Sequence, residues 1–473
     1  MTEPHLSKSL YLSALQCDRR LWFDINTPEK ATPVTESQRH IFRMGTEVGR
    51  AAHHLFPGGL LVDAPAWDHA AALRQTRDAM AEETVPALFE AAFEYEGVRI
   101  RVDILERLGA ADEGRWGIRE VKSSSKVKPE QHLPDLAIQK WVVEKCGVDV
   151  QSAELIHVSK RFVRGADEIH WPDYFARAEQ IEELAVQSSA EFSARLEAMH
   201  KTLEASSAPI REPGSFCKKP HLCGYWNYCT AKKSASWVIA QTGASKARKA
   251  RMIDVIESDR PWFSNELADE LADARPPIWA LDFEAIGPAI PFYPGTRAYQ
   301  AITFQWSLHR LGEDGKIEHL EYLADGREDP RPEVARTLIE ALGRDSAPIL
   351  VYSSYEARCL KDMAARVPDL ANAIEGILDR LVDLLPIVRG HVYHPEMNGS
   401  FSIKAVGPAF APQVSYGDLE GVADGMAALA AFARLVGGEL GRPEAAKVRR
   451  ELLAYCRLDT LALLEMYRAL RDN

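Results

Sequence analysis

Two stretches of strand-forming sequence, far apart in the chain, constrain its fold most. Residues 87–123 alternate apolar and polar side chains and turn at glycines, which is the pattern of neighbouring strands in one sheet. A second stretch, residues 278–324, opens with the apolar segment IWALDFEAI and continues with two further strand-like segments. Because 473 residues also exceed one ordinary domain, we expect an α/β chain with a separate sheet in each of two domains.

Helical patterns surround both stretches. In the second half, three strands are followed by alternating helix and strand, which favours a mixed sheet with helices on both faces. The Arg-Pro-Pro run at 275–277 marks a boundary after a polar, largely helical stretch. We expect helices over residues 7–55 (with a loop near 27–33), 129–147, about 172–205, 331–343 and 444–471. The predicted domain limits are 1–232 and 276–473, with a basic helical linker over 233–275.

The composition is that of a soluble globular protein, with 46% hydrophobic and 27% charged residues. The net charge of −12 does not exclude nucleic acid, because such binding depends on local basic surface. No apolar run reaches membrane-spanning length, and the opening MTEPHLSKSLYL lacks the layout of a secretion signal. We therefore expect a cytoplasmic protein with no membrane partner, in which the odd count of seven cysteines argues against a disulfide framework.

One acid on a strand and a Glu-x-Lys on the next form the first candidate site. Asp103 lies in IRVDIL, and Glu120 and Lys122 lie in REVKSS. Glu120 and Lys122 point to the same face of a strand because the side-chain period is two. Two carboxylates that converge from neighbouring strands suit Mg²⁺ or Mn²⁺, and such an ion activates a water for phosphodiester hydrolysis. The alternative is that all three are ordinary solvent-facing strand residues.

Two further positions accompany this triplet. Gln139 lies on the helix that follows the Glu-x-Lys strand. Upstream, Gly49 and His53 form Gly-x-x-x-His in a helical segment, and a His53 nitrogen ligand would favour Mn²⁺. Since His54 is adjacent, a pair of histidines on the helix surface is the alternative.

With these residues in order, the first half resembles the RecB-type PD-(D/E)xK nucleases, in particular the CRISPR-associated iron–sulfur exonucleases. The resemblance covers about residues 7–232 and implies a restriction-endonuclease-like domain. It also implies that Asp103 and Glu120 bind metal, that Lys122 is the catalytic lysine and that Gln139 is the helix-borne glutamine. One departure is the aromatic that usually follows this glutamine, for which Trp141 stands in place of a tyrosine.

Four cysteines form a candidate cofactor site. Cys217, Cys223 and Cys229 are closely spaced, and Cys17 lies about two hundred residues earlier. Thiolates bind zinc or iron–sulfur clusters. One distant and three close cysteines resemble the four-cysteine cluster of the same nucleases and imply a 4Fe-4S group, although the first gap is longer than usual. Zinc and buried structural cysteines are the alternatives. The remaining cysteines are expected to be small hydrophobic side chains: Cys146, Cys359 and Cys456.

A basic stretch follows this site. Residues 215–253 contain no acid and interleave lysines and arginines with aromatic residues. Such a stretch suits phosphate contacts and base stacking, and a solvated basic face is the alternative.

A second acid set lies in the other half of the chain. Asp282 and Glu284 share one face of an apolar strand, where paired carboxylates are costly unless they bind metal. Glu356 begins a predicted helix, and Tyr455 lies one helical turn before Asp459. Four acids can bind two metal ions that act on a phosphodiester.

This ordered set resembles the DEDDy 3′–5′ exonucleases, which have an RNase H-like fold, over about residues 276–473. The resemblance implies metal-binding roles for Asp282, Glu284, Glu356 and Asp459, and a water-orienting role for Tyr455. Glu356 departs from the family, which usually has aspartate at that position. Two further residues have proposed roles: Asp383 as a supplementary acid, and Lys404 as either a phosphate contact or a surface lysine.

The whole chain resembles proteins that fuse these two domains, a group known as predicted RecB-family nucleases. We therefore expect a metal-dependent nuclease with two active sites that hydrolyses DNA at ends or in single strands, with DNA favoured over RNA as the partner. A second interpretation keeps one active site and makes the other domain a substrate-gripping module. A third is a non-catalytic nucleic-acid-binding scaffold.

Overall fold

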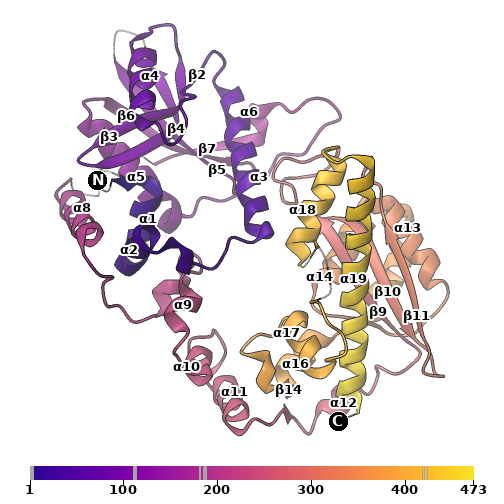
Figure 1. Ribbon diagram of the computed structural model, residues 1–473. Coiled ribbons are helices and arrows are strands. Elements are labelled where there is room, and N and C mark those ends of the chain that lie inside the picture. Colours follow the sequence, from indigo (N-terminus) through magenta and orange to yellow (C-terminus); the bar gives the residue numbers. More distant parts are fainter. Residues whose placement is uncertain are drawn as a thin grey trace. The chain divides into compact units, whose positions relative to one another are not determined.

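The computed structural model describes residues 5–109, 114–180, 183–184, 189–417, 419, 421–422 and 424–472. The chain forms two compact units, each with its own sheet (Figure 1). The first unit comprises Met1–Val34, Ile41–Lys232 and Pro288–Ala298. The second comprises Thr35–His40, Lys233–Gly287 and Tyr299–Asn473.

The first unit is built on a mixed sheet with the strand order β2-β3-β4-β5-β6-β7, and β1 pairs parallel with β4. The central strands β3, β4 and β5 are antiparallel, and β6 runs parallel to β5. This confirms the strands expected over 87–123. The strands are β1 (Leu6–Ser7), β2 (Leu60–Leu61), β3 (Ala87–Tyr95), β4 (Val98–Leu108), β5 (Arg115–Lys122), β6 (Asp149–Val158) and β7 (Phe175–Glu179).

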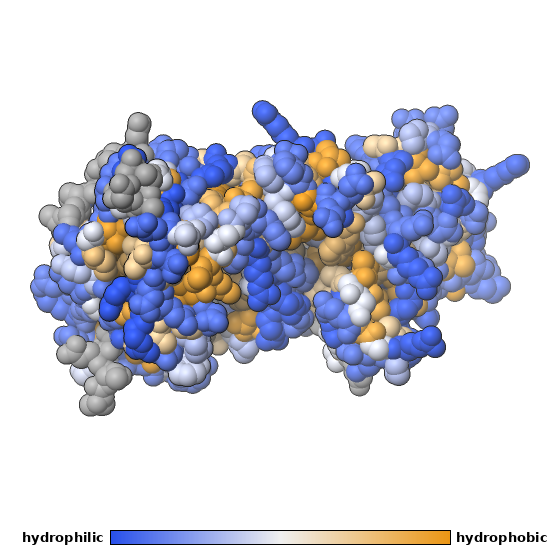
Figure 2. Space-filling view, turned by 90° about the horizontal axis from the view of Figure 1, so that it is seen from above, coloured by the Kyte–Doolittle hydropathy of each residue, from blue (hydrophilic) through white to orange (hydrophobic). Residues whose placement is uncertain are grey.

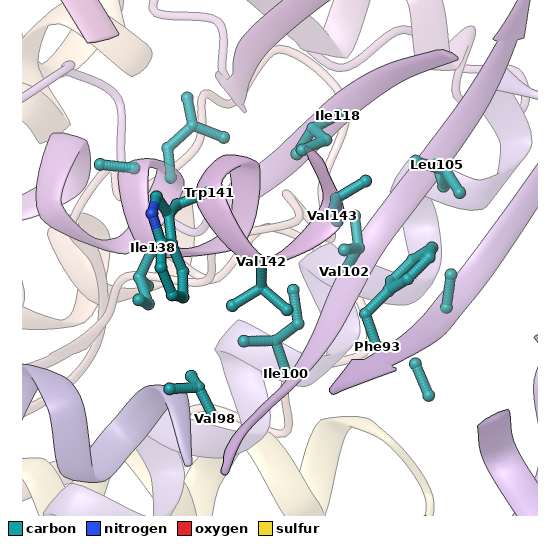
Figure 3. Close-up of a cluster of buried hydrophobic side chains, with 14 of the residues drawn as sticks. Phe93, Val98, Ile100, Val102, Leu105, Ile118, Ile138, Trp141, Val142 and Val143 are labelled. Atoms are coloured by element: carbon teal, nitrogen blue, oxygen red, sulfur yellow. The ribbon is translucent and has the colours of Figure 1, made fainter. Parts of the chain in front are cut away.

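Helix α5 covers the middle of this sheet. It begins with Pro129 in its first turn and is followed by Gly147 at φ +85°, the arrangement that favours a helix between proline and glycine. Figure 3 shows its Ile138, Trp141 and Val142 packed in the same apolar cluster as Ile100 and Val102 of β4. The helices are α1 (Lys8–Gln16), α2 (Asp18–Asn26), α3 (Glu36–Ala52, shared with the second unit), α4 (His69–Ala81), α5 (Pro129–Lys145), α6 (Trp171–Tyr174), α8 (Ser189–Glu204) and α9 (Trp226–Thr230), with short 3₁₀ turns η1 (Pro28–Lys30), η2 (His53–Leu55) and η4 (Ser215–Lys218).

The single amphipathic helix expected over about 172–205 is wrong. The chain forms the short α6, then strand β7, and α8 only from Ser189. Strand β7 pairs antiparallel with β6 from Glu154↔Glu179 to Val158↔Phe175. This pairing satisfies the backbone of β6, which would otherwise be an exposed sheet edge, and it outweighs the local helical preference of the segment.

The second unit contains a mixed sheet with the order β11-β10-β9-β12-β13. Its first three strands are antiparallel, and β12 and β13 run parallel to β9, as expected from the order of strands and helices. The strands are β9 (Ile278–Ile286), β10 (Ile302–Leu311), β11 (Ile317–Leu323), β12 (Ile349–Val351) and β13 (Leu381–Asp383), and a separate pair joins β8 (Trp262–Phe263) to β14 (Val392–Tyr393).

Alternation along β9 gives this sheet two apolar faces. Trp279, Leu281 and Phe283 pack with α13, α14 and α15, whereas Ile278 and Ala280 pack with the long helix α19, which lies along β9 and β10 (Figure 1). The helices are α10 (Ala235–Ala240), α11 (Lys246–Ser258), α12 (Leu267–Glu270), α13 (Arg331–Leu342), α14 (Tyr355–Arg366), α15 (Ala371–Leu378), α16 (Leu384–His391), α17 (Ile403–Phe410), α18 (Gly425–Val436) and α19 (Arg442–Arg471), with 3₁₀ turns η5 (Pro368–Leu370) and η6 (Pro395–Met397).

Residues 233–275 differ from the linker that the sequence suggests. Ile239, Met252, Val255 and Leu271 are buried in the same apolar cluster as residues of α19, so this stretch is part of the second unit. Hydrophilic side chains cover most of the face seen in Figure 2, with smaller apolar patches between them. Among the described residues, no helix is both long and apolar enough to cross a bilayer.

Candidate active sites

Strand β5 and helix α5 bring the first set of predicted residues together. Glu120 and Lys122 lie on one face of β5, and Lys122 Nζ is 2.6 Å from Glu120 Oε1. Gln139 donates its amide to Glu120 Oε2 at 2.7 Å. The glutamine on the helix therefore fixes the orientation of the acid on the strand, since it occupies the second carboxylate oxygen.

Asp103 joins this group where two strands separate. The pairing of β4 with β5 extends only as far as Ile104↔Arg119, and the Asp103 carboxylate then accepts a hydrogen bond from the Val121 amide at 2.8 Å. Asp103 keeps 28% of its side chain exposed, whereas Glu120 keeps 2%. Solvent and a ligand can thus reach Asp103, while Glu120 closes the bottom of the site.

Sequence reasoning missed two residues at this site, a lysine and a further acid. Lys8, in the first turn of α1, lies 3.3 Å from Glu120, 3.3 Å from Asp135 and 3.9 Å from Asp103. Asp135 also contacts Lys122 and accepts a hydrogen bond from Gln139 at 3.0 Å. Asp135 lies one turn before Gln139 on α5, a spacing that could have identified it. Lys8 carries no comparable signal because only the fold brings α1 to β5.

Charge compensation divides the acids of this cluster into two kinds. Burial alone would raise the pKa of Glu120, but Lys122 and Lys8 outweigh it and hold that pKa well below its usual range. Burial and the neighbouring Glu120 raise the pKa of Asp103 to about 7. Burial and Glu120 also raise the pKa of Asp135. Glu120 is therefore a permanent carboxylate, and Asp103 is a group whose charge depends on what binds beside it.

The structure does not bring His53 to this cluster. Its ring stacks on Phe89, with centroids 3.8 Å apart and an interplanar angle of 3°. Burial lowers the pKa of the His53 imidazole, and among the described residues no contact joins it to Asp103 or Glu120. The reason is local: α3 ends at Ala52, and His53 lies in the following turn η2.

The four predicted cysteines line one small cavity of the first unit. Gln16 positions the two segments that carry them, because its amide donates to the carbonyls of Phe216, Lys219 and His221 at 3.1, 2.9 and 2.9 Å. Burial raises the pKa of the thiols of Cys17, Cys223 and Cys229. Arginine side chains also line the cavity: Arg19, Arg20 and Arg211.

These thiols are not gathered into a compact metal-binding group. Among the described residues, the group whose ligand atoms all lie within 4.8 Å of one another is Asp282, Glu284 and Cys456. No three of the four cavity sulfurs therefore lie within 4.8 Å of one another, whereas a tetrahedron with Zn–S bonds of about 2.3 Å places all of them roughly 3.8 Å apart.

Alternation along β9 places Asp282 and Glu284 on the face that α19 covers. Helix α19 contributes Cys456 and Asp459, which lie three residues apart. Cys456 Sγ is 3.5 Å from Asp282 Oδ2. Cys456 was expected to be a simple hydrophobic side chain; it is fully buried, but its sulfur contacts this acid cluster.

Glu356 enters the cluster from the first turn of α14. It is 4% exposed, and its Oε2 atom has no hydrogen-bond partner among the described residues. Burial, with a smaller effect of Asp383, raises the pKa of Glu356 to about 7. Asp383 itself caps α16, because its Oδ1 atom accepts a hydrogen bond from the Leu385 amide at 2.9 Å.

The acids on β9 and α19 repel one another. Burial raises the pKa of Asp282, and the charges of Asp459 and Glu356 add to that rise. Burial and Asp282 raise the pKa of Glu284, and burial raises that of Asp459. Carboxylates crowded at this depth stay ionised only if a cation compensates them.

Two tyrosines and one lysine complete the second cluster. Tyr455 is 3% exposed and hydrogen-bonds to Asp459, one turn further along α19. Tyr416 donates to Asp459 Oδ1 at 2.6 Å, a contact that no sequence pattern indicates. Lys404 Nζ lies 4.7 Å from the centre of the Tyr455 ring and 5.6 Å from that of Tyr416. Lys404 thus belongs to the site, with its ammonium beside Glu284 and Asp459.

Comparison with known proteins yields one match. Residues 279–402 match a family described as a domain of unknown function, DUF2779. The matched segment contains Asp282, Glu284 and Glu356 but ends before Tyr455 and Asp459. No curated protein and no solved structure matches the chain.

Proposed function

We propose that this protein is a metal-dependent nuclease with one hydrolytic site in each unit. The crowding of buried acids in the second unit carries this proposal. Asp282 and Glu284 share one face of β9 with Asp459 and Cys456 opposite them, and Lys404 is a cation whose charge acts on Glu284. Such a group is stable when a divalent cation balances its charge.

The orphaned oxygen of Glu356 supports this fit. A carboxylate that is 4% exposed and leaves one oxygen without a partner costs free energy unless a ligand occupies it. Asp282, Glu284, Asp459 and Glu356 would hold Mg²⁺ or Mn²⁺, which prefer oxygen ligands. A bound divalent cation supplies the Lewis acid for hydrolysis of a phosphodiester.

The protein's own groups account for the remaining chemistry of the second site. The Tyr455 hydroxyl, hydrogen-bonded to Asp459, is suited to hold the attacking water in line. The Lys404 ammonium beside both tyrosine rings is suited to contact a phosphate oxygen of the substrate. These roles support a DEDDy-type exonuclease with an RNase H-like fold.

In the first unit, Asp103 and Glu120 would hold the metal ion, and Lys122 would orient the water. The hydrogen bond from Gln139 to Glu120 supports the PD-(D/E)xK interpretation. In that interpretation the glutamine on the helix holds the buried metal-binding glutamate in place. The PD-(D/E)xK resemblance and the nucleic-acid substrate, with DNA favoured over RNA, belong to the same proposal.

The cysteine cavity would hold an iron–sulfur cluster. All four cysteines line this one cavity, and four cysteine thiolates are the usual ligands of an iron–sulfur cluster. The nearby Arg19, Arg20 and Arg211 would balance the negative charge of four thiolates. Protein purified without air should be brown; colourless protein with stoichiometric zinc would contradict this part of the proposal.

One observation favours a second candidate function, in which only the second site cleaves. Lys8 and Lys122 already compensate Asp103, Glu120 and Asp135, so the first cluster has less need of a divalent cation. The first unit would then grip the substrate.

The test is digestion of end-labelled single- and double-stranded DNA and RNA by the full chain, with Mg²⁺ and Mn²⁺ compared. Glu120→Gln should silence the first site, and Asp282→Asn the second, because each removes the charge of a proposed metal ligand. If Asp282→Asn alone abolished all cleavage, the single-site function would hold. Cleavage that persisted at full rate in the double variant would refute both.

A further inference from the structure

A groove of about 610 Å³ lies beside the first acid cluster. Its walls come from the N-terminal residues 5–9, the segment 62–69 and strands β3 and β4. Lys8 belongs to both places: it lines the groove, and its ammonium contacts Glu120 and Asp135. Lys8 therefore joins the groove to the acid cluster.

An exposed tryptophan forms part of the groove wall. Trp67 is 84% exposed, although indole rings usually contribute most of their area to a core or an interface. A free indole face in a groove offers a stacking surface to any planar group. An unpaired nucleic-acid base is such a group, whereas the bases of an intact duplex are already stacked on one another.

Two arginines line the same groove. Arg99 and Arg101 lie two residues apart on β4, so their side chains share one face of the strand. Arg101 donates to the carbonyls of Glu90 and Ala64 at 3.3 and 3.2 Å, which fixes the guanidinium without neutralising it. Arg99 Nε is 3.1 Å from Glu94 Oε2. Because this ion pair is partly exposed and therefore weak, the Arg99 guanidinium can release the carboxylate and bind a phosphate.

Acidic side chains partly offset the positive charge of Lys8, Arg99 and Arg101 in the groove. Glu90 lines the groove, and burial, opposed by the charges of Lys8 and Arg101, raises the pKa of its carboxyl. Among the described residues that line the groove Glu90 is the acid, and Glu94 lies beside it in its pair with Arg99. The combination of a stacking face, fixed guanidinium groups and a path to a carboxylate cluster matches the recognition chemistry of a single strand.

We propose that this groove holds the unpaired end of one nucleic-acid strand, with a base stacked on Trp67 and phosphates on Arg99 and Arg101. The strand would thereby deliver a phosphodiester to Asp103 and Glu120. This inference rests on the proposed function of the first site and adds the binding groove that would select a single-stranded end over an intact duplex.

The experiment uses the full chain carrying Asp282→Asn, so that only the first site acts. Cleavage of a labelled oligothymidylate and of a blunt duplex of matching length is followed over a range of substrate concentrations. Trp67→Ala should raise KM for the single strand by roughly tenfold, the scale of losing one base–aromatic stack, with kcat little changed. Trp67→Phe, which keeps an aromatic face, should restore most of the affinity.

Three comparisons make the result specific. Ile210→Ala removes another exposed apolar side chain of the first unit, which is 100% exposed, and should change nothing. Arg101→Gln should reduce the slope of log binding constant against log salt concentration for the single strand by about one, because one fewer counterion is released. The blunt duplex should respond little to any of these changes.

The possible outcomes distinguish a failure of the groove inference from a failure of the proposed nuclease function. If the chain cleaves but Trp67→Ala binds the oligothymidylate as the parent does, the groove serves another ligand, such as a protein partner, and the inference is wrong. An equal loss for single strand and duplex would also overturn it. If the Asp282→Asn chain neither binds nor cleaves either substrate, the proposed nuclease function of the first site fails, whatever the groove binds.

Discussion

Two histidines beneath α19 should make the second unit sensitive to mild acid. His309 Nδ1 and Thr460 Oγ1 lie 2.8 Å apart, and Thr460 also bonds to Ser307, whose hydroxyl is 3.0 Å from His319 Nε2. Thr460 follows the proposed metal ligand Asp459 on α19. The network thus anchors the helix turn that carries part of the second site.

The size of the effect follows from the shifted pKa values. Burial, together with His319 and Arg457, lowers the pKa of His309 from 6.5 to about 3, and burial lowers that of His319 to about 4. The folded unit therefore holds His309 neutral, while the unfolded chain takes up a proton below its pKa of 6.5. Neutral His309 contributes its full share of folding stability above pH 6.5. This contribution is lost as the pH falls from 6.5 toward the folded pKa of about 3. By linkage, the loss from His309 alone reaches about 2 kcal/mol near pH 5.

The assay is denaturant unfolding of the full chain at neutral pH and near pH 5, read by hydrogen exchange of peptides from β10 and α19. His309→Asn cannot take up a proton, and its side-chain amide can replace the Nδ1 contact with Thr460. The variant should therefore lose about 2 kcal/mol less than the parent on acidification. An identical pH dependence in both proteins would refute the reasoning and assign the titration to other groups.

Three further changes test other parts of the structure. Tyr455→Phe, in a Glu120→Gln background, should slow cleavage by the second site by roughly tenfold to a thousandfold with little change in metal affinity; full activity of this variant would contradict the water-positioning role. Gln139→Leu should destabilise the first unit by about 1–3 kcal/mol, because it leaves buried Glu120 without its amide donor, and urea unfolding measures this loss. Gln16→Leu removes the amide that holds three carbonyls of the cysteine-bearing loop, so Cys223 should react faster with a thiol reagent; unchanged labelling would show that other contacts hold the loop.

The sequence predicted the strands that carry the acids because their signals are local. Alternation with a period of two is sufficient to put Asp282 and Glu284 on one face, and Glu120 and Lys122 on another. The pattern could not predict β7, since the Phe175–Glu179 segment becomes a strand only by pairing with β6. It likewise could not predict that Ile239 and Met252 join the core of the second unit.

The missed site residues share a physical cause. Lys8 and Tyr416 reach their clusters from elements distant in sequence, and their own neighbours carry no catalytic pattern. Cys456 was misjudged because a buried thiol in a helix is usually only a packing group. Conversely, His53 fitted a spacing pattern, but its ring stacks on Phe89. Spacing identifies candidates, whereas contacts between distant segments decide which of them share a site.

The interlaced chain path has a consequence for anyone who produces this protein in pieces. Residues 288–298 belong to the first unit, where the buried Tyr174 hydroxyl donates to the Ala289 carbonyl at 2.8 Å and the Arg164 amide to the Thr296 carbonyl at 2.9 Å. A fragment that stops at residue 232 or 275 leaves that hydroxyl buried without its acceptor, at a cost of about 1–3 kcal/mol. A fragment that starts at residue 233 carries the excised segment without its surroundings. The gene therefore has no single cutting point that yields two intact halves. Recombination that exchanges one unit between homologous chains must transfer at least two separate coding segments together.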